Sequence, residues 1–563
     1  MEKQKRLGDM LVENGIISEQ ELAFALVLQQ NTDKKLGEIL ASQGFISEND
    51  TMHFLQLQLN TRFVDLSKIN IDPALVALVP SVIAKKYILV PVELQNGTLE
   101  VAMEDPLDFI AIEDLKRASK LNIEPVIASG ESIRQAIRRL YGAEFAEKAV
   151  KEYSDKFSSS VLVTEEAEED VIDETSNAPI VRLLDSIIEQ AVQSQASDVH
   201  IEPFEKDIRI RIRIDGILQN ILVIPKNLHL ALVARIKILG GMNIAEKRLP
   251  QDGRIEINIL GKLIDLRISV MPTCHGEKVV LRILDRGNFL VDKSKLGFSS
   301  ENLEKFCDLL KNPHGIILVT GPTGSGKTTT LYTMLNELNN EGSNIITIED
   351  PVEYMLKGIN QTQVNTKAGL YFATGLRALL RQDPDIVMVG EIRDKETAEI
   401  AVRAAITGHL VLSTLHTNDA VSTIVRLMDM GIDPYLLAAS MVGVISQRLL
   451  RKICPGCKVP YKPLAFECEL LGIGQNESAM FFKGEGCGLC NRTGYKGRFP
   501  VHEILVINKK HREMIGQRAS LEDIKTYSEQ SGMSTLLNEC RKSLQLGMTT
   551  TDEAIRVSYS RDN

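Results

Sequence analysis

A glycine-rich segment at residues 321–328 has the residue types and spacing of a phosphate-binding loop. It reads G-P-T-G-S-G-K-T, which matches the pattern G-x-x-x-x-G-K-[ST]. In such a loop the backbone N–H groups face phosphate oxygens, the lysine lies near the β- and γ-phosphates, and the next hydroxyl binds Mg²⁺. The predicted ATP ligands are Gly321, Pro322, Thr323, Gly324, Ser325, Gly326, Lys327, Thr328 and Thr329, with Thr328 also the Mg²⁺ ligand.

Acidic side chains and one histidine follow short apolar runs beyond this loop. The catalytic candidates are Glu349, Glu353, Glu391 and His416. Because the carboxyl ends of parallel strands meet at one ligand crevice, an acid there can hold Mg²⁺ through water or orient the attacking water. A histidine at the same edge can sense the γ-phosphate. Solvated loop acids and a structural histidine are the alternatives.

Two C-x-x-C pairs suggest a metal site. They are Cys454 with Cys457 and Cys487 with Cys490, separated by 29 residues. Four thiolates at this spacing form a closed, structural Cys₄ zinc site, with an insertion loop between the pairs. Two disulfides or free thiols are the alternative. Cys468 has no partner at ligand spacing, and Cys274, Cys307 and Cys540 are predicted to be buried apolar residues.

The elements that position these residues follow from apolar patterning. Four short runs predict strands of a buried parallel sheet, at 316–320, 345–348, 386–389 and 410–415, and a helix is predicted over 329–338. Residues 61–141 and 176–295 each predict a smaller module with strands and helices. In the second, isoleucines alternate with arginines over 208–214 and end in an Asp-Gly turn, which predicts a hairpin with one cationic face.

The charge of the chain is concentrated in one segment. The 563 residues carry 65 basic and 75 acidic side chains, a net charge of −10. Residues 144–174 hold eleven acids and three lysines, so −8 of that total comes from a predicted flexible linker. The acidic balance argues against a nucleic-acid coat. Because we find neither a signal-peptide core nor an apolar run long enough to span a membrane, we expect a cytoplasmic chain.

The motor motifs together resemble the ATPases of type II secretion and type IV pilus assembly. The residues that carry this resemblance are the phosphate-binding loop, I-T-I-E-D-P-V-E-Y at 346–354, R-Q-D-P-D-I-V-M-V-G-E-I-R-D at 381–394 and T-G-H-L-V-L-S-T-L-H-T-N-D-A at 407–420. The resemblance implies a ring hexamer in which a PAS-like module precedes a RecA-like motor. Glu391 then matches the Walker B glutamate. Glu349 and Glu353 fall in the box that positions the catalytic water, and the sequence leaves open which one is the base.

The resemblance also gives the arginines a role. Such an active site needs cations on the developing phosphoryl charge, and the family places arginines of the PAS-like module there. Arg213 and Arg254 are the first candidates, and Arg254 lies in a predicted turn at 251–254. Arg267 and Arg282 are the second candidates. A solvated cationic sheet face is the alternative. Arg254→Ala is predicted to lower turnover while nucleotide still binds.

An internal repeat occupies the first sixty residues, and its two units resemble the MshEN domain, a cyclic-di-GMP receptor of these ATPases. The residues that match the first unit are Arg6, Leu7, Gly8, Leu22, Leu26 and Gln29. Lys35, Leu36, Gly37, Leu40, Leu55 and Gln58 match the second. The second unit differs at two positions, where Lys35 replaces an arginine and Thr51 replaces a leucine. A lysine can still pair with a phosphate, but it lacks the planar guanidinium fork. A docking scaffold for a membrane partner is the alternative.

The predicted architecture is α/β, with four parts. They are an MshEN-like domain at 1–143, the acidic linker at 144–175, the PAS-like module at 176–295 and the RecA-like motor at 296–563, with a zinc insertion at about 451–495. The resemblance implies an inner-membrane platform protein and cytoplasmic assembly proteins as partners, so that the hexamer reaches the membrane only through them. No nucleic-acid partner is expected.

The predicted function is a Mg²⁺-dependent ATPase that drives pilin assembly at the inner face of the membrane. Secretion through pseudopilus assembly shares every motor motif with pilus assembly, and a DNA-uptake motor of the same family is a third option. A non-hydrolysing receptor for nucleotide or cyclic-di-GMP is the alternative of another class, and Lys327, Thr328, Glu353 and Glu391 argue against it. A helicase is less favoured because the sequence has no obvious basic tract.

Overall fold

The computed structural model divides the chain into two compact units, residues 1–284 with 487–492 and residues 285–486 with 493–563. Its described residues are 11–12, 16–30, 40, 61–66, 69, 71–76, 78–95, 97–130, 132–134, 136–137, 140–141, 178–259, 261–285, 291–473 and 480–558. The predicted acidic linker at 144–174 lies outside them. Within the described ranges, no helix is long and apolar enough to cross a membrane.

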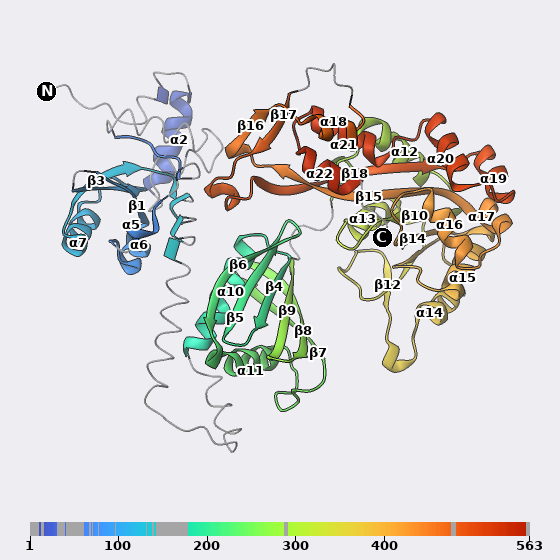
Figure 1. The fold of residues 1–563 in the computed structure, drawn as a ribbon, viewed down its shortest axis with the longest axis horizontal. Helices are drawn as coiled ribbons and strands as arrows, with labels where there is room; N and C mark the ends of the chain where they lie inside the picture. The colour runs from blue at the N-terminus through green and yellow to red at the C-terminus, as the bar shows by residue number, and fades with distance from the viewer. Residues whose placement is uncertain are drawn as a thin grey trace. The chain divides into compact units, whose positions relative to one another are not determined.

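The module at residues 61–141 is a small mixed sheet with helices, as predicted (Figure 1). Its strands are β1 (Leu89–Gln95), β2 (Thr98–Met103) and β3 (Asn122–Ile127), in the order β1-β2-β3. Its helices are α5 (Pro73–Val76), α6 (Ser81–Tyr87) and α7 (Phe109–Ser119), and α2 (Glu19–Gln30) precedes them. β2 pairs antiparallel with β1 and parallel with β3. The buried side chains of both element types form one apolar core.

The module at residues 178–285 contains a six-stranded sheet in the order β6-β5-β4-β9-β8-β7. The strands are β4 (Asp198–Pro203), β5 (Asp207–Ile214), β6 (Ile217–Pro225), β7 (Gln251–Ile259), β8 (Lys262–Thr273) and β9 (Gly276–Asp285). Helices α10 (Ala178–Gln193) and α11 (His229–Leu239) and the short η1 (Lys226–Leu228) accompany them. The β5–β6 hairpin is confirmed: Asp215 and Gly216 both have positive φ, as a two-residue turn requires, and Ile208, Ile210 and Ile212 are buried.

The predicted turn at 251–254 is wrong, because these residues lie in strand β7, paired with β8. Glycine is needed at position 253 for a reason other than a turn. A Cβ on Gly253 would lie 2.6 Å from the carbonyl oxygen of Gly240, so Gly253 allows a close backbone approach within a strand. Arg254 is therefore a strand residue whose side chain direction is set by the sheet.

The larger α/β domain is built on a seven-stranded sheet in the order β12-β11-β13-β14-β10-β15-β18. The strands are β10 (Gly315–Thr320), β11 (Ile345–Glu349), β12 (Asn360–Gln363), β13 (Ile386–Val389), β14 (Leu410–Leu415), β15 (Met441–Ile453) and β18 (Tyr495–Val506). The four predicted strands are confirmed. All pairs in this sheet are parallel except β15 with β18. Every residue of β10, β11, β13 and β14 is buried, as expected when helices cover both faces.

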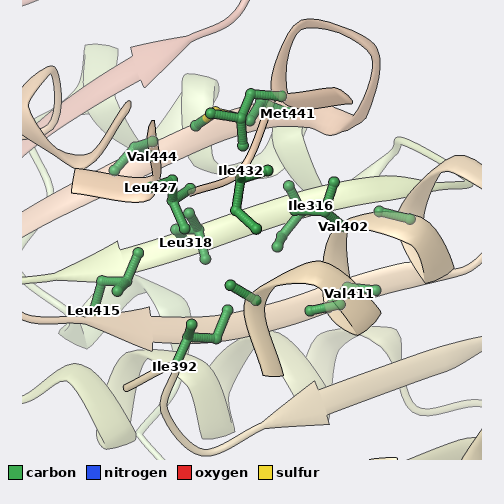
Figure 2. Close-up of a cluster of buried hydrophobic side chains, with 14 of the residues drawn as sticks. Ile316, Leu318, Ile392, Val402, Val411, Leu415, Leu427, Ile432, Met441 and Val444 are labelled. Atoms are coloured by element: carbon green, nitrogen blue, oxygen red, sulfur yellow. The ribbon is translucent and has the colours of Figure 1, made fainter. Parts of the chain in front are cut away.

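Alternate residues of β10 enter two different cores, one on each face of the sheet. Ile316 and Leu318 pack with helices that follow β13 and β14, as Figure 2 shows, whereas Ile317 and Val319 pack with the helix that follows the phosphate-binding loop. The helices are α12 (Ser300–Leu310), α13 (Lys327–Leu338), α14 (Phe372–Leu379), α15 (Lys395–Ile406), α16 (Ser422–Asp429) and α17 (Pro434–Ser440), with short turns η2 (Lys293–Lys295) and η3 (Thr366–Ala368). The strand that leads into the phosphate-binding loop is therefore packed on both faces of the sheet.

The long strands β15 and β18 continue into an insertion that carries the C-x-x-C pairs. It contains η4 (Pro455–Cys457), β16 (Lys458–Tyr461), α18 (Ala465–Leu470), β17 (Phe481–Gly484) and η5 (Gly488–Cys490). The chain then ends in α19 (Lys509–Gly516), α20 (Leu521–Gln530), α21 (Leu536–Gln545) and α22 (Thr551–Ser558). Of the cysteines predicted to be buried, Cys540 is buried and Cys307 is half-buried, but Cys274 is exposed because it lies in the β8–β9 turn.

Candidate nucleotide and metal sites

The phosphate-binding loop turns directly from β10 into α13. Gly321, Gly324 and Gly326 have φ values of 143°, 78° and 89°, which side-chain-bearing residues rarely adopt. Gly326 precedes the first helical residue and supplies no side-chain cap, so the N–H groups at the helix start are available to an anion. Thr323, Gly324 and Thr328 are exposed. The loop therefore has the open backbone cradle that ATP phosphates need.

Lys327 is 9% exposed and its ammonium faces the loop itself. Nζ donates to the carbonyl oxygens of Gly321 at 2.9 Å and Pro322 at 3.1 Å. The pKa of Lys327 is lowered to about 8, mainly by burial and also by the charge of Arg448, while the carboxylate of Glu391 acts in the opposite direction. Phosphate oxygens would stabilise the charged form in the same way as Glu391, and the role of Lys327 at the phosphates stays a prediction.

Gln447 of β15 braces the loop and was not singled out from the sequence. Its Nε2 donates to the Ser325 carbonyl at 2.7 Å, and its Oε1 accepts from the Thr330 hydroxyl at 2.6 Å. The side chain is 2% exposed. A Cβ on Gly321 would lie 2.3 Å from the Gln447 carbonyl oxygen, so that glycine permits β15 to approach the loop.

We predict that Gln447→Ala weakens ADP binding about tenfold. The change leaves the buried Ser325 carbonyl without this donor, which costs about 1–3 kcal/mol. Only part of that free energy is expected to appear as weaker ADP binding, because the loop can partly adjust. Calorimetric titration with Mg²⁺ and ADP measures it. Gln517→Ala, at the exposed end of α19, is the control and should bind ADP as the wild type does. An unchanged dissociation constant in Gln447→Ala would contradict the bracing role.

The structure brings Glu391 and His416 together beside Lys327. Glu391 lies two residues beyond β13, and its side chain is 15% exposed. It pairs with Arg393 Nη2 at 2.5 Å and lies 3.7 Å from His416 Nε2. Burial lowers the pKa of His416, and the positive charge of Lys327 lowers it further while Glu391 raises it. The arrangement places one carboxylate and one imidazole at the predicted ligand edge of the sheet.

The two glutamates of the 346–354 box have different surroundings. Glu349 is 3% exposed, and its carboxylate accepts from Tyr332, from Thr347 at 2.6 Å and from Gln361 at 3.1 Å. Three of its roughly four acceptor positions are therefore used within the protein. Glu353 is half-buried, and its backbone N–H donates to the Tyr332 hydroxyl at 3.2 Å. Of the two carboxylates, Glu349 is the more buried and the one held by three donors within the protein.

The candidate arginines are held by acids of their own module. Arg254 makes a bidentate pair with Asp265, at 2.8 and 2.7 Å, and that carboxylate is 1% exposed. Arg213 lies 3.6 Å from Asp198 and donates to the Gly216 carbonyl at 2.9 Å. Arg282 lies 3.2 Å from the same Asp198. Their role at the phosphates stays a prediction, as does that of Arg267, and Arg254→Ala would also leave a buried carboxylate without its strongest partner.

The four cysteines Cys454, Cys457, Cys487 and Cys490 converge, with their Sγ atoms all within 4.8 Å of one another. The Sγ atoms of Cys487 and Cys490 are 3.8 Å apart, the separation expected for two sulfurs on one tetrahedral zinc at about 2.3 Å from each. Gly486 N–H donates to Cys457 Sγ at 3.3 Å, which supports a thiolate. The donor set and geometry fit zinc better than two disulfides.

We predict that the purified chain carries about one zinc ion and that Cys457→Ser loses it. Because a structural site contributes to folding, the variant should also unfold at a lower temperature. Elemental analysis and thermal unfolding measure both effects. Cys468→Ser, outside the cluster, is the matched control and should retain the metal. Zinc-free wild-type protein of full thermal stability would rule the site out.

Most residues of the predicted cyclic-di-GMP site cannot be placed. Arg6, Leu7, Gly8, Lys35, Leu36, Gly37, Leu55 and Gln58 lie outside the described residues, as does the side chain of Gln29. Leu22 and Leu26 lie on α2, where Leu26 is 43% exposed. Leu40 is buried with Leu11, Ile17 and Ala25. Within the described ranges, α2 therefore exposes the apolar side chains of Phe24 and Leu26 and packs others in a small core.

Glu503 of β18 links the turn after β14 to the C-terminal helices. Its carboxylate accepts from the N–H groups of Ala420 at 2.8 Å and Leu536 at 3.1 Å. The pKa of Glu503 is raised to about 6, mainly by burial and also by the charge of Asp419, although the two N–H donors act in the opposite direction. The folded chain therefore keeps a proton there at pH values where the unfolded chain, with a pKa of 4.5, has lost it.

We predict that this titration costs stability as the pH rises. The contribution of protonated Glu503 is fully present below about pH 4.5 and is lost as the pH rises through about 6, a change of about 2 kcal/mol. Glu503→Gln resembles the protonated acid and lacks this titration. Between pH 5 and pH 8 the wild type should therefore lose thermal stability relative to the variant. A constant difference across that range would contradict the raised pKa.

Comparisons with known proteins agree with this geometry. Residues 173–556 match the family described as Type II/IV secretion system protein, and residues 59–147 match the MshEN domain. The chain is 43% identical to the type IV pilus assembly ATPase PilB of Myxococcus xanthus over 98% of both chains. It is 44% identical to the type II secretion system protein E of Pseudomonas aeruginosa over 81% of this chain and 92% of that one.

A solved structure shows the same fold at low sequence identity. The Yersinia pseudotuberculosis ATPase DotB is 19% identical, covers 67% of this chain and 93% of its own, and superposes with a TM-score of 0.50. Together with the phosphate-binding loop and the acids around it, the family match also accounts for the chemistry. The chain belongs to the type II/IV secretion system family of ATPases, which serve type IV pilus assembly or type II secretion, and it carries an N-terminal MshEN domain.

Proposed function

We propose that this ATPase drives type IV pilus assembly. The observation that carries the proposal is the likeness to the Myxococcus xanthus assembly ATPase, which extends over 98% of both chains and so includes the N-terminal region. The secretion relative of Pseudomonas aeruginosa matches 81% of this chain. The acting assembly is proposed to be a homo-hexamer at the inner face of the cytoplasmic membrane, docked on a platform protein and its cytoplasmic assembly partners.

Deleting the gene in its own host distinguishes a function in pilus assembly from a function in secretion. Loss of surface pili with normal export of secreted enzymes supports pilus assembly, and the opposite result supports secretion. Complementation with the wild type must restore the lost process, and complementation with Lys327→Ala must not, because that variant lacks the ammonium of the phosphate-binding loop. Loss of DNA uptake with both other processes intact would support the DNA-uptake reading and contradict pilus assembly.

For hydrolysis, we propose that Lys327 and the loop N–H groups bind the phosphates and that Glu353 orients and deprotonates the attacking water. Glu391 is proposed to act as the Walker B glutamate, where Arg393 pairs with its carboxylate and His416 Nε2 lies 3.7 Å away. Mg²⁺ bound beside Thr328 would neutralise phosphate charge. Arg213 and Arg254 are proposed to supply further cations at the phosphates, and Arg267 and Arg282 are the second candidates for this role. The support for Glu353 over Glu349 is that Glu349 is buried and already accepts three hydrogen bonds within the protein.

We further propose that the N-terminal region binds cyclic-di-GMP. The support is the MshEN match at 59–147 and the repeat before it, which supplies apolar contacts such as Leu22 and Leu26 and cations at Arg6 and Lys35. Calorimetric titration of the full chain tests it, with Arg6→Ala as the weakened variant. No heat at high micromolar ligand would favour the scaffold reading.

A further inference from the structure

A buried tyrosine on the phosphate-binding helix contacts the loop that carries Glu353. Tyr332 lies in α13 and is 1% exposed. Its hydroxyl donates to Glu349 Oε2 at 2.5 Å and accepts the backbone N–H of Glu353 at 3.2 Å. One hydroxyl group therefore joins α13 both to the end of β11 and to the loop that follows it.

The direction of these two hydrogen bonds is set by Glu349. A phenol has a single proton, so donating it to the buried carboxylate leaves the oxygen lone pairs for the N–H of Glu353. Burial and the charge of Glu349 both raise the pKa of Tyr332, so the hydroxyl keeps its proton. Thr347 and Gln361 hold the other oxygen of Glu349 and stop the carboxylate from rotating.

Other contacts hold the same loop from the side of β12. Gln361 Nε2 donates to the Tyr354 carbonyl at 2.9 Å, and Gln361 Oε1 accepts the Leu356 N–H at 2.6 Å. The rings of Tyr332 and Tyr354 also meet edge to face, with centroids 5.9 Å apart. These contacts fix the loop to the sheet, whereas the Tyr332 hydroxyl fixes it to the helix that binds phosphate.

The geometry of α13 places Tyr332 near the predicted Mg²⁺ ligand. Tyr332 follows Thr328 by four residues, so the two side chains lie on the same face of α13, one turn apart. Thr328 is the residue expected to hold Mg²⁺ at the phosphates. The same helix face thus carries the metal-binding hydroxyl at its start and, one turn further, the hydroxyl that contacts Glu353.

We propose that Tyr332 is a positioning residue for ATP hydrolysis: its hydroxyl holds the backbone of Glu353 so that the Glu353 carboxylate stays aligned with the phosphates bound at α13. The inference rests on the proposal that Glu353 is the base. Tyr332 itself contacts neither nucleotide nor water in this role, and it acts only through the loop.

Tyr332→Phe tests the proposal because it removes one oxygen and keeps the ring. We expect kcat to fall about ten- to a hundredfold, since a small misplacement of a catalytic group costs that much, while KM for ATP and the dissociation constant of ADP change less than about twofold. Hydrogen exchange at the Glu353 amide should accelerate. Tyr495→Phe is the control: it removes a hydroxyl at the start of β18 that contacts Thr550 at 2.7 Å, and it should leave kcat and that amide unchanged.

A double variant separates this inference from the assignment of the base. If Tyr332 acts through Glu353, adding Tyr332→Phe to Glu353→Gln lowers single-turnover hydrolysis no further. Wild-type kcat in Tyr332→Phe overturns the positioning role while leaving Glu353 as the base. Wild-type activity in Glu353→Gln overturns the base, and this role with it. An equal fall in both backgrounds also overturns the proposal, because the hydroxyl would then act independently of Glu353.

Discussion

Glu353→Gln is expected to lower the rate of ATP hydrolysis about 10²- to 10⁴-fold while nucleotide still binds. The amide keeps the size of the side chain but cannot accept a proton from water, and proton transfer to a positioned base is worth about that factor. The lysine, the loop N–H groups and the start of α13 are untouched, so the affinity for ADP should stay within about twofold. Phosphate release and ADP titration measure the two quantities on one preparation.

Glu349→Gln is the informative comparison, because the residue is four positions away and chemically identical. Its carboxylate accepts three hydrogen bonds in a buried site, and an amide oxygen cannot replace both carboxylate oxygens. That variant should therefore unfold at a lower temperature and lose less activity, through the shared Tyr332 hydroxyl. If Glu349→Gln is fully stable and less active than Glu353→Gln, the two assignments are reversed.

Glu391→Gln is expected to lower hydrolysis about 10²- to 10³-fold, also with ADP binding retained. In the structure its carboxylate pairs with Arg393 and lies beside His416, and its charge favours the protonated form of Lys327. A neutral amide removes all three electrostatic effects at the place where phosphoryl charge develops, and the loss of one such group costs about that factor.

The matched control for this variant is Glu399→Gln on α15. That carboxylate also pairs with an arginine, Arg403 Nη2 at 2.7 Å, but both side chains are exposed. Exposed pairs contribute little, so this variant should hydrolyse ATP at the wild-type rate. Equal losses in the two variants would mean that Glu391 acts only through its ion pair on the surface and has no special place in the reaction.

The central strands and the phosphate-binding loop could be predicted because each is encoded locally. Buried parallel strands need continuous apolar runs, and the loop needs glycines next to a lysine, so both patterns can be recognised without knowing the fold. The carboxyl-end position of Glu391 and His416 follows from the same rule. The convergence of the four cysteines follows from their spacing.

The residues that brace the site could not be predicted, because their partners are distant in sequence. Gln447 meets Ser325 across 122 positions, and Glu503 meets Ala420 across 83, through strand registers that no local pattern encodes. Tyr332 reads simply as an apolar position of a helix. Arg254 was misplaced for a related reason: Gly253 serves a close approach to Gly240, which only the folded sheet reveals.

One continuous strand connects the nucleotide and the cysteines. β15 lies beside the phosphate-binding loop at Gln447 and runs to Ile453, after which Cys454 enters the cysteine cluster. The six steps between these points span about 20 Å of strand. Pairing with β18 runs along this segment, with a register shift between Arg451 and Ile453. A metal bound by the four cysteines would therefore constrain the far end of the strand whose Gln447 contacts the phosphate-binding loop.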